Sequence, residues 1–252
     1  MDPFALAGRV ALVTGSTRGL GRAMANALGR AGAKVAFNYY NDEGTADRAL
    51  NEFVAEGLEG ILVRGDITDP ADVERVVGEI GERLGPVDIL VPNATCAQPM
   101  ELIEDYDWET YQRMIDFFVK SPFLLTRACL PHMKQQGWGR IINICTTAFV
   151  AGKPVFSAYV AAKGGQVGMS RSLASELAPF GITVNMVSPG WIPVERHADE
   201  PQAAKDAYRD RIPTGRLGVP DDVGGAVVFL ASEAASFVTG QNINVNGGVT
   251  IG

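Results

Sequence analysis

The stretch VALVTGSTRGLG, residues 10–21, decides the fold. Its first half is typical of a buried strand, and the helical pattern after the glycines runs to about Ala31, where Gly32 suits the end of a helix. Glycines at such a handover let the backbone turn tightly and approach a pyrophosphate, and the start of the helix offers unpaired N–H groups to an anion. The stretch predicts a phosphate-binding turn, although an ordinary tight turn also contains glycines.

The same order of strand and helix repeats along the chain. Further strands are expected at 34–39, 61–63, 87–91, 140–145, 182–187 and 242–245, and helices at 45–56, from 69, and at 108–134, 157–177 and 222–231. This alternation indicates right-handed crossovers and a parallel sheet covered on both faces. We therefore expect α/β architecture: one Rossmann-type, doubly wound domain of about seven strands over residues 1–252. The segment 190–220 is expected to be irregular and to act as a substrate loop or lid.

Composition excludes several classes of protein. Among 252 residues, 22 Lys and Arg oppose 29 Asp and Glu, which gives a formal charge of −7. This balance argues against nucleic-acid and membrane-surface partners, and no apolar run is long enough for a membrane helix. The N-terminus does not have the pattern of a signal peptide, and three scattered cysteines predict neither a metal site nor a disulfide framework. We expect a cytoplasmic protein.

Charges near the first two strands indicate which nucleotide binds. An acidic residue after the second strand usually holds the ribose of NAD, but Asn38 and Tyr39 end that strand here. Arg18 in the glycine-rich turn offers a planar donor fork to a 2′-phosphate, although it also suits a solvated loop. NADP(H) is therefore favoured over NAD(H). Asp66, after the third strand, is a candidate for the adenine amino group or for a turn.

Tyr159 and Lys163 lie four residues apart on a predicted helix, which places a phenol and an ammonium on one face. The ammonium favours the phenolate, so we expect it to lower the pKa of Tyr159 and suit the phenol to proton exchange with an alcohol or ketone. Alone, such a pair is common on protein surfaces.

Together these motifs resemble the short-chain dehydrogenase/reductase family over nearly the whole chain, and most closely its 3-oxoacyl-carrier-protein reductase-like branch. The resemblance rests on the glycine-rich turn, Asp66, Asn93-Ala94, Tyr159 with Lys163, and Ser188-Pro189-Gly190. It implies that Tyr159 is the general acid/base, that Lys163 holds the nicotinamide ribose, and that the protein is a homotetramer or homodimer. The implied cofactor contacts are Gly15, Thr17, Arg18, Gly19, Leu20, Gly21, Asn38, Tyr39, Asp66, Ile67, Asn93, Ala94, Tyr159, Lys163, Pro189, Gly190 and Ile192.

Two catalytic positions depart from the family pattern. Thr146 replaces the family's serine and keeps a hydroxyl for the substrate oxygen. Phe118 replaces an asparagine whose main-chain carbonyl, in the family, holds a relay water. Because Pro122 lacks an N–H, the carbonyl of Phe118 loses its helical partner and remains a candidate acceptor near Lys163. Thr95 and Val194 also differ from the family, close to the nicotinamide.

These features predict an NADP(H)-dependent oxidoreductase that interconverts a small-molecule carbonyl and a secondary alcohol. Thr146 would polarise the oxygen, and Tyr159 would move the proton. Two alternatives stay open: a nucleotide-binding protein without turnover, and a redox-neutral lyase or epimerase.

Overall fold

A computed structural model describes residues 2–251 of the chain. Its strands are β1 (Val10–Thr14), β2 (Lys34–Tyr39), β3 (Gly60–Arg64), β4 (Ile89–Val91), β5 (Gly139–Ile144), β6 (Ile182–Pro189) and β7 (Asn242–Val245). Its α-helices are α1 (Gly19–Arg30), α2 (Glu43–Ala55), α3 (Pro70–Arg83), α4 (Trp108–Ile115), α5 (Ser121–Gln136), α6 (Ala148–Ala151), α7 (Ser157–Leu177), α8 (Gln202–Arg209) and α9 (Pro220–Ala231). A π-helical turn, Asp116–Lys120, joins α4 to α5.

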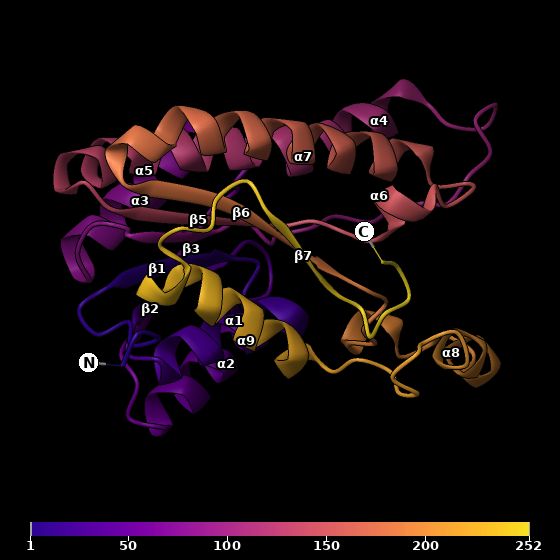
Figure 1. Cartoon of the computed structure of the whole chain (residues 1–252), viewed down its shortest axis with the longest axis horizontal. Helices are drawn as coiled ribbons and strands as arrows, with labels where there is room; N and C mark the ends of the chain where they lie inside the picture. Colours follow the sequence, from indigo (N-terminus) through magenta and orange to yellow (C-terminus); the bar gives the residue numbers. More distant parts are fainter. Residues whose placement is uncertain (1, 252) are drawn as a thin grey trace.

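The seven strands form one parallel sheet in the order β3-β2-β1-β4-β5-β6-β7. Helices α1, α2 and α9 cover one face, while α3, α5 and α7 cover the other (Figure 1). Each face buries its own apolar cluster, so the strands are hydrophobic on both sides, as the sequence predicts. The strand order reverses between β1 and β4, and a doubly wound sheet binds ligands at the carboxyl ends beside such a reversal.

Several predicted elements match closely, including α7 and β7. The cap of α3 also matches, because the Asp69 side chain accepts from the N–H of Asp72 and Pro70 opens the helix. Three expectations were wrong in detail. The segment 190–220 contains α8 and a short 3₁₀ turn, Glu195–His197, and is not irregular throughout. The stretch 108–134 is one α-helix, a π turn and a second α-helix, and β4 is shorter than 87–91.

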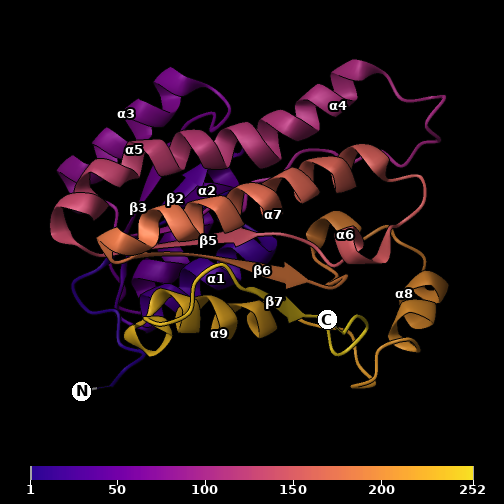
Figure 2. The same ribbon diagram turned by 45° about the horizontal axis from the view of Figure 1, so that its top comes forward.

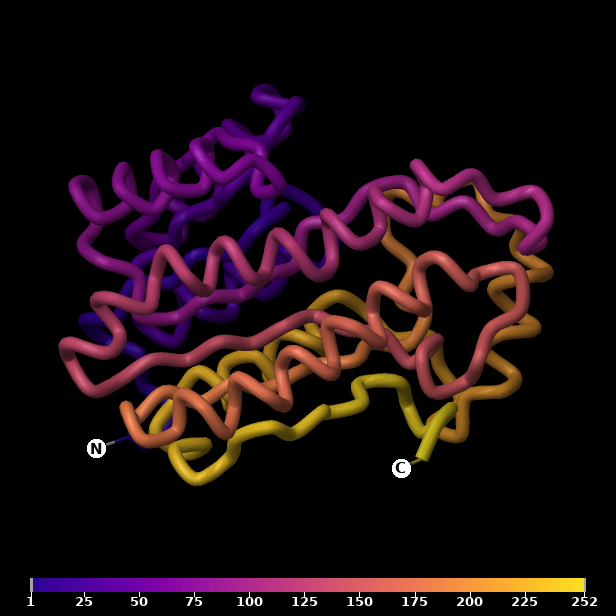
Figure 3. Tube along the Cα trace, turned by 90° about the horizontal axis from the view of Figure 1, so that it is seen from above, coloured from indigo at the N-terminus to yellow at the C-terminus, as the bar shows by residue number. Residues whose placement is uncertain are grey.

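Three connections gather at the carboxyl end of the sheet. They are the loop before α4, the loop carrying α6, and the segment carrying α8 (Figure 2). Seen from above, the same three segments lie together at one end of the molecule (Figure 3). None of the helices among the described residues is long and apolar enough to cross a membrane.

Candidate active site

The glycine-rich turn is tied to the end of β4. The Thr14 hydroxyl accepts from the N–H groups of Asn93 and Ala94 at 2.9 and 3.0 Å. In return, the Asn93 side chain donates to the carbonyls of Thr14 and Gly15 at 2.9 and 3.2 Å. A Cβ on Gly15 would lie 2.8 Å from Ala94 Cα, so only glycine permits this approach. The turn and the β4 loop therefore form one rigid floor.

The start of α1 fits an anion. Arg18 is exposed and caps the helix, and the N–H of Gly19 is its first donor. The Glu195 carboxylate, from the segment before α8, accepts from this N–H at 3.4 Å. A carboxylate at this position shows that the N–H faces outward to negative charge, as a pyrophosphate requires. Thr17, Leu20 and Gly21 belong to the same turn and first helical turn.

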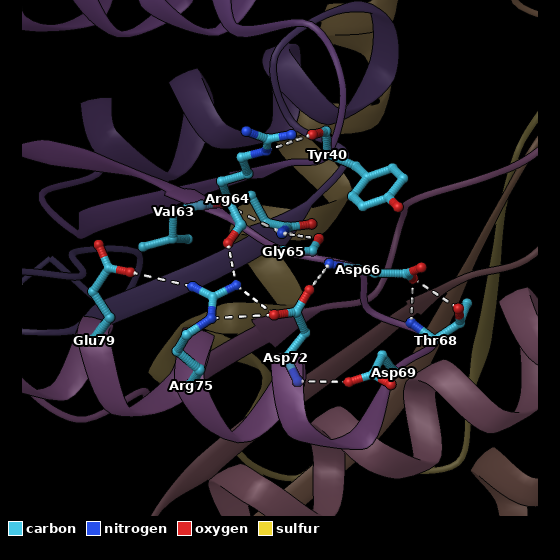
Figure 4. Close-up of polar contacts among 11 residues, drawn as sticks. Tyr40, Val63, Arg64, Gly65, Asp66, Thr68, Asp69, Asp72, Arg75 and Glu79 are labelled. Carbon is cyan, nitrogen blue, oxygen red and sulfur yellow. Dashed lines mark hydrogen bonds and ion pairs between the residues drawn. The ribbon is translucent and has the colours of Figure 1, made fainter.

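The carboxyl ends of β2 and β3 are braced from α3. Asp66 Oδ1 accepts from the N–H and hydroxyl of Thr68 at 2.8 and 2.7 Å, so the predicted turn role is present (Figure 4). The N–H of Asp66 donates to Asp72, whose other oxygen binds Arg75 (Figure 4). These bonds hold the pKa of Asp72 below its ordinary value.

Two predicted nucleotide contacts next to this brace have structural roles. Asn38 is buried, and its side chain donates to the carbonyl of Gly65 at 3.1 Å. Ile67 is buried in the core on the α3 side of the sheet. Tyr39 is partly exposed at the end of β2. Of these three side chains, Tyr39 is therefore the one available to a ligand.

Tyr159 and Thr146 lie together, as predicted for a catalytic pair. Thr146 accepts from the N–H of Ala148 at 3.1 Å, which leaves its proton to donate to the phenol. Burial raises the pKa of Tyr159 to about 12, against the opposing effect of the Thr146 hydrogen bond. The expected net lowering of the Tyr159 pKa was therefore wrong for the protein alone. The Lys163 ammonium is 5.9 Å from the centre of the phenol ring and binds other groups.

Lys163 is buried beneath Tyr159. Its Nζ donates to the Ile144 carbonyl at 2.6 Å and to Oε1 of Gln166 at 2.9 Å. The same Nζ lies 4.1 Å from the ring centre of Phe118, whose ring packs edge-on against Tyr159 with centres 5.2 Å apart. Burial lowers the pKa of Lys163 to about 8.

The helix that contains Phe118 departs from regular α-helical geometry just before Pro122, as the sequence predicts. The π turn shifts the main-chain bonding, and the N–H of Ser121 donates to Asp116, five residues back. A small cavity lies between this turn and Lys163, lined by Phe118, Pro122 and Gln166 among others.

The Pro189–Ile192 segment crosses the carboxyl end of β6. The Pro189 carbonyl accepts from the Thr147 N–H at 3.4 Å, and the Gly190 N–H donates to Val245 at 3.0 Å. Ile192 is buried. A separate pocket of about 310 Å³ lies between this segment, α8 and β7.

Three side chains near the site were missed in the sequence: Gln166 on Lys163, Glu195 on Gly19, and Arg196. The Arg196 charge acts to lower the pKa of both Tyr159 and Lys163. No short motif marks these residues, because their contacts join distant segments or depend on burial. Within residues 2–251, no group of three or more His, Cys, Asp or Glu is placed to hold a metal ion.

The chain is similar to known proteins over nearly its whole length. The model of the enoyl-(acyl carrier protein) reductase family matches residues 15–250. Nodulation protein G of Azospirillum brasilense is 39% identical over 96% of this chain and 98% of its own. The 3-oxoacyl-(acyl-carrier-protein) reductase of Escherichia coli is 38% identical over 96% of this chain and 97% of its own. A gluconate 5-dehydrogenase from Burkholderia cenocepacia, solved with NADP and tartrate, has a TM-score of 0.92 and 33% identity, with 98% and 97% covered.

Proposed function

This chain belongs to the short-chain dehydrogenase/reductase family, in the branch of the 3-oxoacyl-carrier-protein reductases, and we propose that it prefers NADP(H) and uses Tyr159 as its general acid/base. It is a nicotinamide-dependent oxidoreductase that acts on the carbonyl or alcohol of a small molecule. The observation that carries the proposal is the meeting of Tyr159, Thr146 and Lys163 at the carboxyl end of the sheet.

The bound nicotinamide supplies or accepts a hydride, and the chain's own residues handle the proton and the oxygen. Thr146 donates a hydrogen bond to the substrate oxygen and orients it toward Tyr159. At neutral pH a phenol with a pKa near 12 keeps its proton, so Tyr159 is ready to donate when a carbonyl is reduced. Lys163, charged below pH about 8, would hold the ribose of the nucleotide.

The preference for NADP(H) rests on charge. Arg18 is exposed at the start of α1. Hydrogen bonds from Thr45 lower the pKa of Asp42, the carboxylate that follows β2, and the positive charge of Arg18 acts in the same direction. The nearest carboxylate after β2, Asp42, caps α2 by accepting from the N–H of Thr45 at 2.9 Å. One of its two oxygens is therefore engaged in the helix cap. We propose further nucleotide contacts from the glycine-rich turn, from the ends of neighbouring strands and from the segment after β6. They are Gly15, Thr17, Gly19, Leu20, Gly21, Asp66, Asn93 and the Pro189–Ile192 segment.

We also propose that the main-chain carbonyl of Phe118 is the acceptor at the far end of a water relay that runs from Tyr159 through the nucleotide ribose and Lys163. The π turn and the missing N–H of Pro122 support this role. Pro122→Ala restores the N–H and is expected to slow turnover with little change in NADPH affinity. Turnover equal to that of the wild type would leave Pro122 as a structural bend only.

We propose that the protein is a cytoplasmic homotetramer or homodimer, and the family likeness and exposed apolar side chains support this. Trp108 and Phe123 are exposed along α4 and α5, which suits a homotetramer or homodimer formed through the long helices. Free cysteines suit the cytoplasm. The segment 190–220 is proposed to close over the substrate.

The test is oxidation of NADPH followed by absorbance with a panel of ketones. Tyr159→Phe removes the ionisable hydroxyl and keeps the ring, so turnover is expected to vanish while NADPH binding stays nearly intact. Tyr111→Phe is the matched control, because its hydroxyl binds Ser157 at the edge of the site at 2.7 Å. Substantial turnover by Tyr159→Phe would place the acid/base elsewhere.

A further inference from the structure

Gln166 is a buried polar side chain on the catalytic face of α7. It is 1% exposed and lies three residues after Lys163, close to one helical turn. Its Oε1 accepts from Lys163 Nζ at 2.9 Å and from the Cys145 thiol at 3.5 Å. A buried amide oxygen is thus directed at the ammonium on which the proposed mechanism depends.

Few groups around the Lys163 ammonium can accept its hydrogen bonds or balance its charge. Its side chain is 4% exposed, so water cannot solvate it as it does a surface lysine. The Ile144 carbonyl and Gln166 supply two acceptors, and the Phe118 ring offers its negative face. An amide oxygen interacts more strongly with a charged ammonium than with a neutral amine, so Gln166 favours the charged form against burial.

The contact with Gln166 is direct. The small cavity beside Lys163 is lined by Phe118, Pro122 and Gln166 itself. Gln166 reaches the ammonium without an intervening water, at 2.9 Å. Phe118 supplies an apolar wall at a position where the family has an amide side chain.

We propose that Gln166 is a positioning residue for Lys163, holding the ammonium charged and directed between Tyr159 and the nucleotide ribose. This inference rests on the proposed function of Lys163. Gln166 touches neither substrate nor reacting atoms in this role. Gln166 lies about one turn along α7 from Lys163 and places an amide next to it. This chain has no amide side chain at position 118, where it has phenylalanine.

The test measures Lys163 itself. Protein labelled with ¹³C at lysine Cε is titrated by NMR without nucleotide, and Lys163→Arg identifies the resonance. Gln166→Met keeps the length and removes the acceptor, and it is expected to lower the Lys163 pKa by about one to two units. Gln166→Glu replaces the amide by a negative charge and is expected to raise it.

Ser170→Ala is the matched control. Ser170 is buried one turn further along the same face and donates to the main-chain carbonyl of Gln166 at 2.7 Å, away from Lys163. This variant is expected to leave the titration of Lys163 unchanged. A merely structural role for Gln166 predicts the same Lys163 titration in the wild type and in Gln166→Met, and that result overturns the proposal.

A turnover measurement separates this inference from the proposed function. At saturating NADPH, the fall of kcat at high pH is expected to move to lower pH in Gln166→Met by the same shift as the Lys163 titration. An unmoved profile in an active variant overturns the positioning role and leaves Tyr159 chemistry intact. If no ketone is turned over even by the wild type, the proposed function fails, and the titration still decides whether Gln166 governs Lys163. If Gln166→Met does not fold, Gln166→Asn, too short to reach Nζ, replaces it in the same titration.

Discussion

Glu195 is the side chain whose removal most directly tests where the nucleotide phosphates lie. Its carboxylate accepts from the N–H of Gly19 at 3.4 Å. A pyrophosphate on the same N–H brings a second negative charge within about 4 Å, where two unit charges repel by about 1 kcal/mol in water and about 4 kcal/mol near a protein surface. Glu195 is exposed, so the lower figure applies. Glu195→Gln is therefore expected to tighten NADPH binding about fivefold at low salt.

The assay is a fluorescence titration of NADPH at low and at physiological ionic strength. The gain from Glu195→Gln is expected to shrink with salt, because the Debye length falls from about 30 Å at 0.01 M to about 8 Å at 0.15 M. Glu200→Gln removes an equal charge from an exposed position of the same segment and is expected to change the Kd less. Equal or weaker binding of NADPH by Glu195→Gln at low salt refutes the placement of the phosphates at Gly19.

Three further changes test other parts of the site. Arg18→Ala is expected to weaken NADPH binding about tenfold or more and leave NADH binding unchanged, since a charge-assisted hydrogen bond is lost; equal effects on both Kd values would contradict a 2′-phosphate contact. Gly21→Ala puts a Cβ 2.3 Å from the Gly15 carbonyl oxygen and is expected to lower the free energy of unfolding in urea by about 1–3 kcal/mol, whereas Gly78→Ala, with open space at its Cβ, should not. Turnover at saturating NADPH is expected to fall above pH about 8, because the lowered pKa of Lys163 leaves its amine neutral there; a profile that stays flat well above that pH would show that the charge is not needed.

Most of the fold could be predicted from the sequence, because parallel sheets require apolar runs and regular crossovers. The strands Val10–Thr14 and Ile182–Pro189, both buried throughout, were predictable for this reason. Helix α8 was not, because its eight residues include no buried side chain to mark a face. The contact of Gln166 with Lys163 was hidden as well, since a polar residue on a helix is ordinarily solvated and its burial depends on how β5 and the π turn pack around it.

The bonds between Thr14 and Asn93 have a consequence for the thermodynamics of nucleotide binding. They hold the backbone of the glycine-rich turn against that of the β4 loop through groups of the chain itself. A nucleotide that binds to this rigid floor loses its own translational and rotational freedom. It orders little of the glycine-rich turn and of the β4 loop. If the segment 190–220 closes over the substrate as proposed, the conformational entropy lost by the protein on binding is concentrated in that segment, which carries Glu195 and α8. On that proposal, half of the pocket is formed before binding and the other half is completed by it.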